Sequence, residues 1–214
     1  MPRWFQETEL NPMVTKIILK KIELCSDEQK NAIRLLRNEE HVRKFMYTDH
    51  EISIEEHILW LKDLKKDPNR QVFLVLKNDR IVIGAVSLVD IDRNEKEAGW
   101  AFYLEQNAKG GLGPILEYTL IDYAFNQMNL ETLKCEVLEN NPNVLRLHRK
   151  FFFCVERFEK MRVYKNNKWL GAFFLSLSKK VWTEQSDLIY IKHKRIFEKF
   201  DINFTMHSAS LNAN

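Results

Sequence analysis

A short glycine-rich segment is the first feature of the chain with chemical meaning. It consists of Lys109, Gly110, Gly111, Leu112 and Gly113, and it joins an apolar strand-like stretch to a helical one. Glycines at such a turn allow backbone N–H groups to converge on a phosphate, and the helix N-terminus and Lys109 add positive charge. Because no Lys-Ser or Lys-Thr pair follows the glycines, the segment does not match a P-loop. A turn that merely starts a helix is the other interpretation.

The elements that must position this segment follow from hydrophobic periodicity. Apolar and polar residues alternate over 16–24 and predict a strand there; further strands are predicted at 71–77 and 81–90, joined across Asn78-Asp79, and at 96–104, 133–138, 155–164 and 170–178. Helical spacing, with a cap at Asp27 and a capping box from Ser53 to Glu56, predicts helices at about 27–38, 53–67, 111–127, 143–151 and 186–200. This order predicts one α/β domain on a mixed sheet. We assign 1–14 to a flexible leader, 15–182 to the domain and 183–214 to a C-terminal helix and disordered tail.

Composition narrows the possible partners. The 214 residues carry a net charge of +3 with acidic and basic residues interspersed, so nothing demands nucleic acid. The three cysteines, Cys25, Cys135 and Cys154, form no C-x-x-C pair, which favours a reducing cytoplasmic location. We expect no metal, because no His, Cys, Asp or Glu set has ligand spacing. We expect no membrane partner, because no apolar run approaches the length of a span.

A second segment adds a family resemblance. Residues 133–141 read Leu-Lys-Cys-Glu-Val-Leu-Glu-Asn-Asn, and 144–153 read Val-Leu-Arg-Leu-His-Arg-Lys-Phe-Phe-Phe. With the glycine segment, their order and spacing across about 16–180 resemble the GNAT acetyltransferases. The resemblance implies the GNAT acyl-CoA N-acyltransferase fold, a mixed and mostly antiparallel sheet with helices on both faces. It also implies acetyl-CoA as co-substrate, entering between two parallel strands that splay apart.

Two positions depart from the family pattern. Ala108 stands where the phosphate loop usually has Gln or Arg, and Phe152 stands where a Gly-Phe turn has its glycine. A bulky residue reaches the left-handed conformation only at a cost, so the shape of that turn stays open.

A narrower resemblance concerns the acceptor. Arg37-Asn38, Val42-Arg43, Met46-Tyr47-Thr48, Ser87–Asp92, Trp100–Tyr103 and Cys135–Asn141 are similar to the pattern of PseH-type enzymes, as are His57, Trp60 and Trp182. These enzymes acetylate the 4-amino group of a UDP-linked 4-amino-4,6-dideoxy sugar on the route to pseudaminic acid. The resemblance therefore implies a bacterial source, a UDP-amino-sugar substrate and a role in surface or flagellin glycosylation.

The implied reaction is direct attack by a neutral amine on the thioester. We assign the base to Glu136, acting through a water that Ser87 helps to hold; a solvated glutamate on a strand face is the alternative. We assign the acid to His148, since histidine titrates near 6.5 and a thiol near 8.5. Packing or phosphate binding by His148 is the alternative, and the thiolate would then leave unaided.

The remaining assignments concern binding. We expect Asn141, His148 and the glycine segment to hold CoA, with a backbone N–H among Phe102, Tyr103 and Leu104 at the oxyanion. For the nucleotide sugar we choose Arg37, Met46, Tyr47 and Tyr103, because a guanidinium suits a diphosphate and aromatic or thioether groups suit a deoxysugar. Met46 and Tyr47 as core residues are the alternative. His57 and Trp60 share a helical face and are expected to pack.

Two other functions stay open. One is an acetyltransferase for protein N-termini of the ribosomal-protein type, and the other is a CoA-binding protein without catalysis. A homodimer is a possible assembly.

Overall fold

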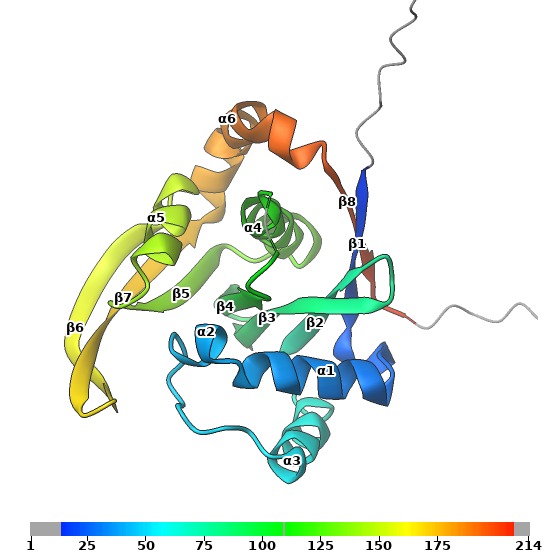
Figure 1. Ribbon diagram of the computed structural model, residues 1–214. Helices are drawn as coiled ribbons and strands as arrows, with labels where there is room; N and C mark the ends of the chain where they lie inside the picture. The colour runs from blue at the N-terminus through cyan, green and yellow to red at the C-terminus, as the bar shows by residue number, and fades with distance from the viewer. Residues whose placement is uncertain (1–13, 109, 208–214) are drawn as a thin grey trace, which may run out of the picture.

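The computed structural model describes residues 14–108 and 110–207. Within them eight strands form one mixed sheet in the order β6-β7-β5-β4-β3-β2-β1-β8 (Figure 1). The strands are β1 Thr15–Lys21, β2 Gln71–Lys77, β3 Ile81–Asp92, β4 Glu97–Leu104, β5 Thr132–Leu138, β6 Cys154–Lys165, β7 Lys168–Ser178 and β8 Phe200–Thr205. The pairs β4–β5 and β1–β8 are parallel and the other neighbours are antiparallel. The predicted fold class is confirmed.

Helices cover both faces of the sheet (Figure 1). The helices are α1 Asp27–Asn38, α2 Glu40–Arg43, α3 Ile54–Leu64, α4 Leu112–Asp122, α5 Pro142–Lys150 and α6 Lys179–Phe197, with a 3-10 turn at Ile22–Leu24 and a π-helical turn at Tyr123–Gln127. One core lies between α4, α6 and the sheet, and a second lies between α1, α3 and the sheet. Since strand side chains alternate, strands β1 to β4 contribute to both cores, whereas β5 and β7 contribute to the first core and to a small third cluster of Leu138, Ala172 and Phe174.

Several element boundaries differ from the sequence prediction. Residues 22–24 form a 3-10 turn rather than the end of a strand. The cap of α1 is Ser26, not Asp27: the Ser26 hydroxyl accepts from Gln29 N–H at 3.3 Å, and the Gln29 side chain accepts from Ser26 N–H at 3.2 Å. Helix α6 begins at 179 rather than 186, so the assigned boundary after Trp182 falls within a helix.

Two elements were not predicted at all. Helix α2 has only four residues, too few for a helical period. Strand β8 lies at 200–205, where the sequence predicted first the end of a helix and then a tail, and it pairs with β1 from Thr15↔Phe200 to Lys20↔Thr205. Residues 1–13 of the assigned leader and 208–214 of the assigned tail lie outside the described residues.

Candidate active site

A gap opens in the sheet between β4 and β5. The two strands pair only at Glu97↔Thr132, Ala98↔Leu133 and Gly99↔Lys134. From Trp100 and Cys135 onward they have no register, although both strands continue. Backbone groups of β4 that would face a partner strand therefore face the gap over Trp100–Leu104. This is the segment, including Phe102, Tyr103 and Leu104, where the sequence placed the oxyanion donor.

Glu136 projects beside this gap from β5. Its neighbour Cys135 points into the core under α4, so Glu136 lies on the α1–α3 face of the sheet. Glu136 Oε2 accepts a hydrogen bond from the Tyr47 hydroxyl and another from Arg162 Nη2 at 3.3 Å. Arg162 Nε also donates to the Tyr47 oxygen at 3.4 Å. Burial first, and then the bond to Glu136, raise the pKa of Tyr47 to about 12, so the phenol is a donor at neutral pH.

Ser87 lies on the same face but does not touch Glu136. It pairs with Ala101, which continues the row toward Glu136, and its hydroxyl donates to the Ala101 carbonyl at 3.4 Å. Ala101 therefore lies between the two side chains in the sheet, and strands are spaced about 4.8 Å apart. Ser87 and Glu136 thus face the same side of the sheet, with β4 between them.

The glycine segment leads into α4 as the sequence predicts. Gly110 and Gly111 have φ values of +87° and +98°, and Gly111 is the N-cap residue of α4. A Cβ at Gly111 would collide with Ile196 of α6, whereas one at Gly110 would meet open space. The segment therefore requires glycine, and its first N–H groups are available at the helix start. Lys109 lies outside the described residues.

His148 is on the opposite side of the sheet from Glu136. Its ring meets Trp100 edge-on at 5.1 Å between centroids, and it lies 5.4 Å from Phe153. Nδ1 lies 2.9 Å from Oε1 of Glu117, a fully buried residue of α4. Burial raises the pKa of Glu117, and the neighbouring His148 opposes that shift. His148 therefore belongs to a buried polar pair on the α4 face.

Helix α5 begins at a capping asparagine and ends in a left-handed turn. The Asn141 side chain caps α5, accepting from Val144 N–H at 3.4 Å. Phe152 adopts φ +66°, so the turn keeps its left-handed conformation despite the bulky residue. The cost is of order 1 kcal/mol.

The residues chosen for the sugar nucleotide divide into two groups. Arg37 and Tyr103 line a cavity of about 370 Å³ between α1, α3 and the sheet. Arg37 Nη2 donates to Thr48 Oγ1 at 2.8 Å, and its buried Nη1 has no partner within the described chain. Tyr47 is next to Thr48 and reaches Glu136 instead. Met46 packs at the edge of the α1–α3 core, as the alternative interpretation expected.

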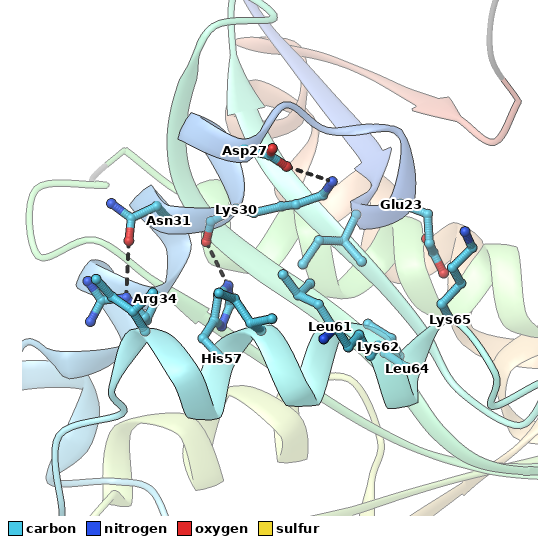
Figure 2. Close-up of a pocket in the computed structure, with 13 residues that line it drawn as sticks. Glu23, Asp27, Lys30, Asn31, Arg34, His57, Leu61, Lys62, Leu64 and Lys65 are labelled. Atoms are coloured by element: carbon cyan, nitrogen blue, oxygen red, sulfur yellow. Dashed lines mark hydrogen bonds and ion pairs between the residues drawn. The ribbon is translucent and has the colours of Figure 1, made fainter.

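A larger cavity, with a volume of about 580 Å³, lies between α1 and α3 (Figure 2). His57 from α3 points to the Lys30 carbonyl of α1 at 2.9 Å, and it stacks with Trp60 at 5.3 Å. None of its lining residues was assigned to the chemistry. The volume of a cavity alone therefore does not identify the candidate active site.

The sequence analysis did not identify three residues that contact the assigned site residues in the structure. Arg162 Nη2 donates to Glu136 Oε2 at 3.3 Å, and Glu117 pairs with His148. Lys165 is buried on β6, and its Nζ donates to the carbonyls of Arg43 at 2.6 Å and Met46 at 3.0 Å and pairs with Asp49 at 3.2 Å. Of these three residues, only Glu117 could have been recognised from the sequence, because it is an acidic residue on the otherwise apolar face of α4.

Among residues 14–108 and 110–207, no group of three His, Cys, Asp or Glu side chains is placed to hold a metal. The same part of the chain contains no helix long and apolar enough to cross a membrane.

Known proteins share both the sequence pattern and the fold. A model of the acetyltransferase (GNAT) domain matches residues 22–172. Acetyltransferase PseH from Campylobacter jejuni strain 81-176 is 33% identical over 139 residues, which cover 65% of this chain and 85% of the relative. PseH from strain ATCC 700819 / NCTC 11168 is 31% identical over the same length. Spermidine N-acetyltransferase from Vibrio cholerae, solved with CoA and spermine, superposes with a TM-score of 0.68 over 74% of this chain and 95% of its own, at 18% identity.

Proposed function

Because this chain belongs to the acetyltransferase (GNAT) family and is a PseH-type, acetyl-CoA-dependent N-acetyltransferase, we propose that its acceptor is the 4-amino group of a UDP-linked 4-amino-4,6-dideoxy sugar. The product would serve pseudaminic acid biosynthesis and flagellin or surface glycosylation in a bacterium. The observation that carries the acceptor is the likeness to PseH over 85% of that protein's length.

The gap between β4 and β5 supports a route for the co-substrate. The pantetheine arm of acetyl-CoA pairs with the free edge of β4, and the pyrophosphate binds the N–H groups that follow Gly110 and Gly111. A backbone N–H within Phe102–Leu104 donates to the oxyanion that forms on the thioester carbonyl. Asn141, at the end of β5, contributes its amide N–H₂ to the cofactor, since its oxygen already caps α5.

Glu136 acts as the base in this proposal. Two donors hold Oε2, which leaves Oε1 to accept the proton of the amine through a water. Ser87 faces the same side of the sheet and orients that water. The neutral amine attacks the thioester carbon, the carbon–sulfur bond breaks, and the electrons leave with sulfur. His148 supplies the proton that the thiolate takes up.

The acceptor enters from the α1–α3 face. Tyr47 donates a hydrogen bond to Glu136, and the next residue in the chain, Thr48, lines the 370 Å³ cavity. The segment that contacts the base therefore also forms part of the cavity wall. Arg37 and Tyr103 bind the nucleotide part there, with the unpartnered Nη1 of Arg37 as a donor to phosphate oxygen. Met46 borders the sugar.

The proposal extends to setting and assembly. Cys25, Cys135 and Cys154 are all unpaired in the described chain, which supports a reducing cytoplasm. We propose that the protein forms a homodimer. Larger assemblies occur among proteins of this fold, since the spermidine N-acetyltransferase of Vibrio cholerae is described as dodecameric. Size-exclusion chromatography with light scattering measures the assembly.

A thiol-release assay with three acceptors tests the function. We expect CoA release with the UDP-4-amino-4,6-dideoxy sugar, and at least 100-fold lower kcat/KM with a peptide N-terminus or with spermidine. Preference for the peptide would establish the ribosomal-protein type instead. Tight acetyl-CoA binding without turnover on any amine would show a non-catalytic CoA-binding protein. Mass spectrometry of the product locates the acetyl group on the 4-amine.

A further inference from the structure

Glu117 is an unusual residue for the middle of an apolar helix face. It is 0% exposed and lies between Leu116 and Leu120, which are also fully buried. Oε1 is 2.9 Å from His148 Nδ1, while Oε2 has no partner among the described residues. Burying a carboxylate is costly unless a charge or hydrogen bond compensates it. The single compensating group in the described chain is the imidazole of His148.

Two residues, Trp100 and Cys135, lie between the Glu117–His148 pair and the gap that separates β4 from β5. Trp100 and Cys135 are the first residues of β4 and β5 beyond the last paired positions, and the His148 ring packs edge-on against Trp100. Trp100 Nε1 is also buried without a partner in the described chain. Cys135 is the other titratable group beside the pair, and burial raises its pKa well above the usual range, so it stays a thiol. The aromatic residues around the ring bring no charge.

Charge balance determines how many protons the pair keeps. The pair is neutral when it holds two protons, one shared between Glu117 Oε1 and His148 Nδ1 and one on His148 Nε2. This charge is the same for a carboxylic acid beside imidazole and for a carboxylate beside imidazolium. Loss of the Nε2 proton leaves a net negative charge in a buried site, which is unfavourable. Burial raises the pKa of Glu117 and so favours retention of the shared proton. The neutral pair therefore presents Nε2–H as a donor.

We propose that Glu117 is a positioning residue for the acetyl transfer, whose carboxylate fixes the His148 ring through Nδ1 and keeps Nε2 protonated to donate to the departing CoA sulfur. This rests on the proposed function of His148. As the amine nitrogen bonds to the acetyl carbon and the carbon–sulfur bond breaks, the Nε2 proton moves to sulfur. The amine proton leaves toward Glu136, and the pair regains its proton from water.

Glu117→Gln tests the role, because glutamine keeps the shape and a hydrogen bond but removes the charge. We expect kcat at pH 8 to fall about 10- to 100-fold, the acetyl-CoA KM to change less than twofold, and the alkaline decline of kcat to begin at lower pH. A merely structural Glu117 would leave the pH profile in place. A wild-type kcat and pH profile in the variant would overturn the proposal.

A measurement that needs no substrate separates this inference from the proposed function. In ¹H–¹⁵N spectra of histidine-labelled protein, the Nδ1–H of His148 should give a far-downfield signal that Glu117→Gln removes. If wild-type protein shows this signal but acetylates no amine, the function is wrong and the pair is real; if it acetylates but lacks the signal, the pair is wrong. Should Glu117→Gln not fold, His148→Gln gives the same kinetic test, and an unchanged pH profile there contradicts the proposal.

Discussion

Glu136 has both of its donors on the same carboxylate oxygen, one from Tyr47 and one from Arg162. These donors come from the segment after α2 and from β6, so three distant parts of the chain meet at one atom. Such an arrangement fixes the carboxylate without occupying its second oxygen. A base that accepts a proton through a water requires this combination of fixed orientation and a free acceptor.

Glu136→Gln should lower kcat about 10²- to 10³-fold, because the amide cannot accept the amine proton. The dissociation constant for acetyl-CoA, measured by isothermal calorimetry, should stay within twofold, since Glu136 lies on the acceptor face. Lys134→Gln is the matched control on the same strand and face, where Lys134 forms an ion pair with Glu97 at 2.6 Å. Equal rates for Glu136→Gln and wild type would exclude Glu136 as the base.

The glycine segment allows an equally local test. Gly110 has open space at its Cβ position, so a side chain can be added there without a collision. Gly110→Asp should raise the acetyl-CoA KM at least tenfold, because a carboxylate would stand near the pyrophosphate. Gly110→Asn has nearly the same shape and backbone preference and should change KM much less. Equal KM values for the two variants would mean that no phosphate binds there.

At the scale of elements, Lys165 ties the segment after α2 to the sheet. Its ammonium donates to the carbonyls of Arg43 and Met46, and the Tyr47 that follows reaches Glu136. A strand on the far side of the gap therefore sets the position of a residue in the acceptor site.

Lys165→Met should raise the acceptor KM about five- to tenfold and leave the acetyl-CoA KM unchanged, because the carbonyls of Arg43 and Met46 lose their donor and the segment shifts. Lys160→Met, an exposed position of the same strand, is the control. Steady-state kinetics with each substrate varied measures both constants. A parallel rise in both KM values would contradict a role confined to the acceptor side, and a lower kcat with both KM values unchanged would indicate partial unfolding.

The hairpin between β6 and β7 offers a test of turn chemistry. Asn166 and Asn167 have φ values of +50° and +59°, the pattern of a type I′ turn. Asn167→Gly should increase the free energy of unfolding by about 0.5–1 kcal/mol, whereas Asn167→Ala should lower it by about 1 kcal/mol. Urea unfolding followed by fluorescence measures both. Stabilisation by alanine would contradict the turn assignment.

Elements with strong local signals were predictable. Strand β2 follows from its short, continuous apolar run, and the start of α3 follows from Ser53 with Glu56. Helix α2 and strand β8 were not, because four and six residues carry little periodicity. The contacts of Glu136 with Tyr47 and Arg162 span 89 and 26 residues, and no local pattern encodes such contacts. The gap, by contrast, came from the family resemblance.

At the scale of the whole molecule, the sheet is completed by its last described strand. Strand β8 lies outside β1, and Phe204 stacks on Tyr123 at 4.6 Å and meets Phe73 edge-on at 5.4 Å. The family match ends at residue 172, so this strand and all of α6 lie beyond the matched region. They nevertheless contribute to the core under α4.

Phe204→Ala should lower the free energy of unfolding by about 2–4 kcal/mol, because it removes an aromatic side chain that packs on this core. Asn203→Ala, at the exposed neighbouring position, should change it by less than 0.5 kcal/mol. Chemical unfolding of both variants provides the measurement. If the two losses were equal, β8 would not be packed as described.

The pairing of β8 with β1 also sets the order in which the protein can be made. During translation β1 emerges before every other described element and β8 after them. The edge of β1 that pairs with β8 therefore has no partner strand until β8 has been synthesised. An open strand edge invites pairing with other chains. Until β8 has been synthesised, β1 can pair on one edge only, with β2, and its other edge stays open.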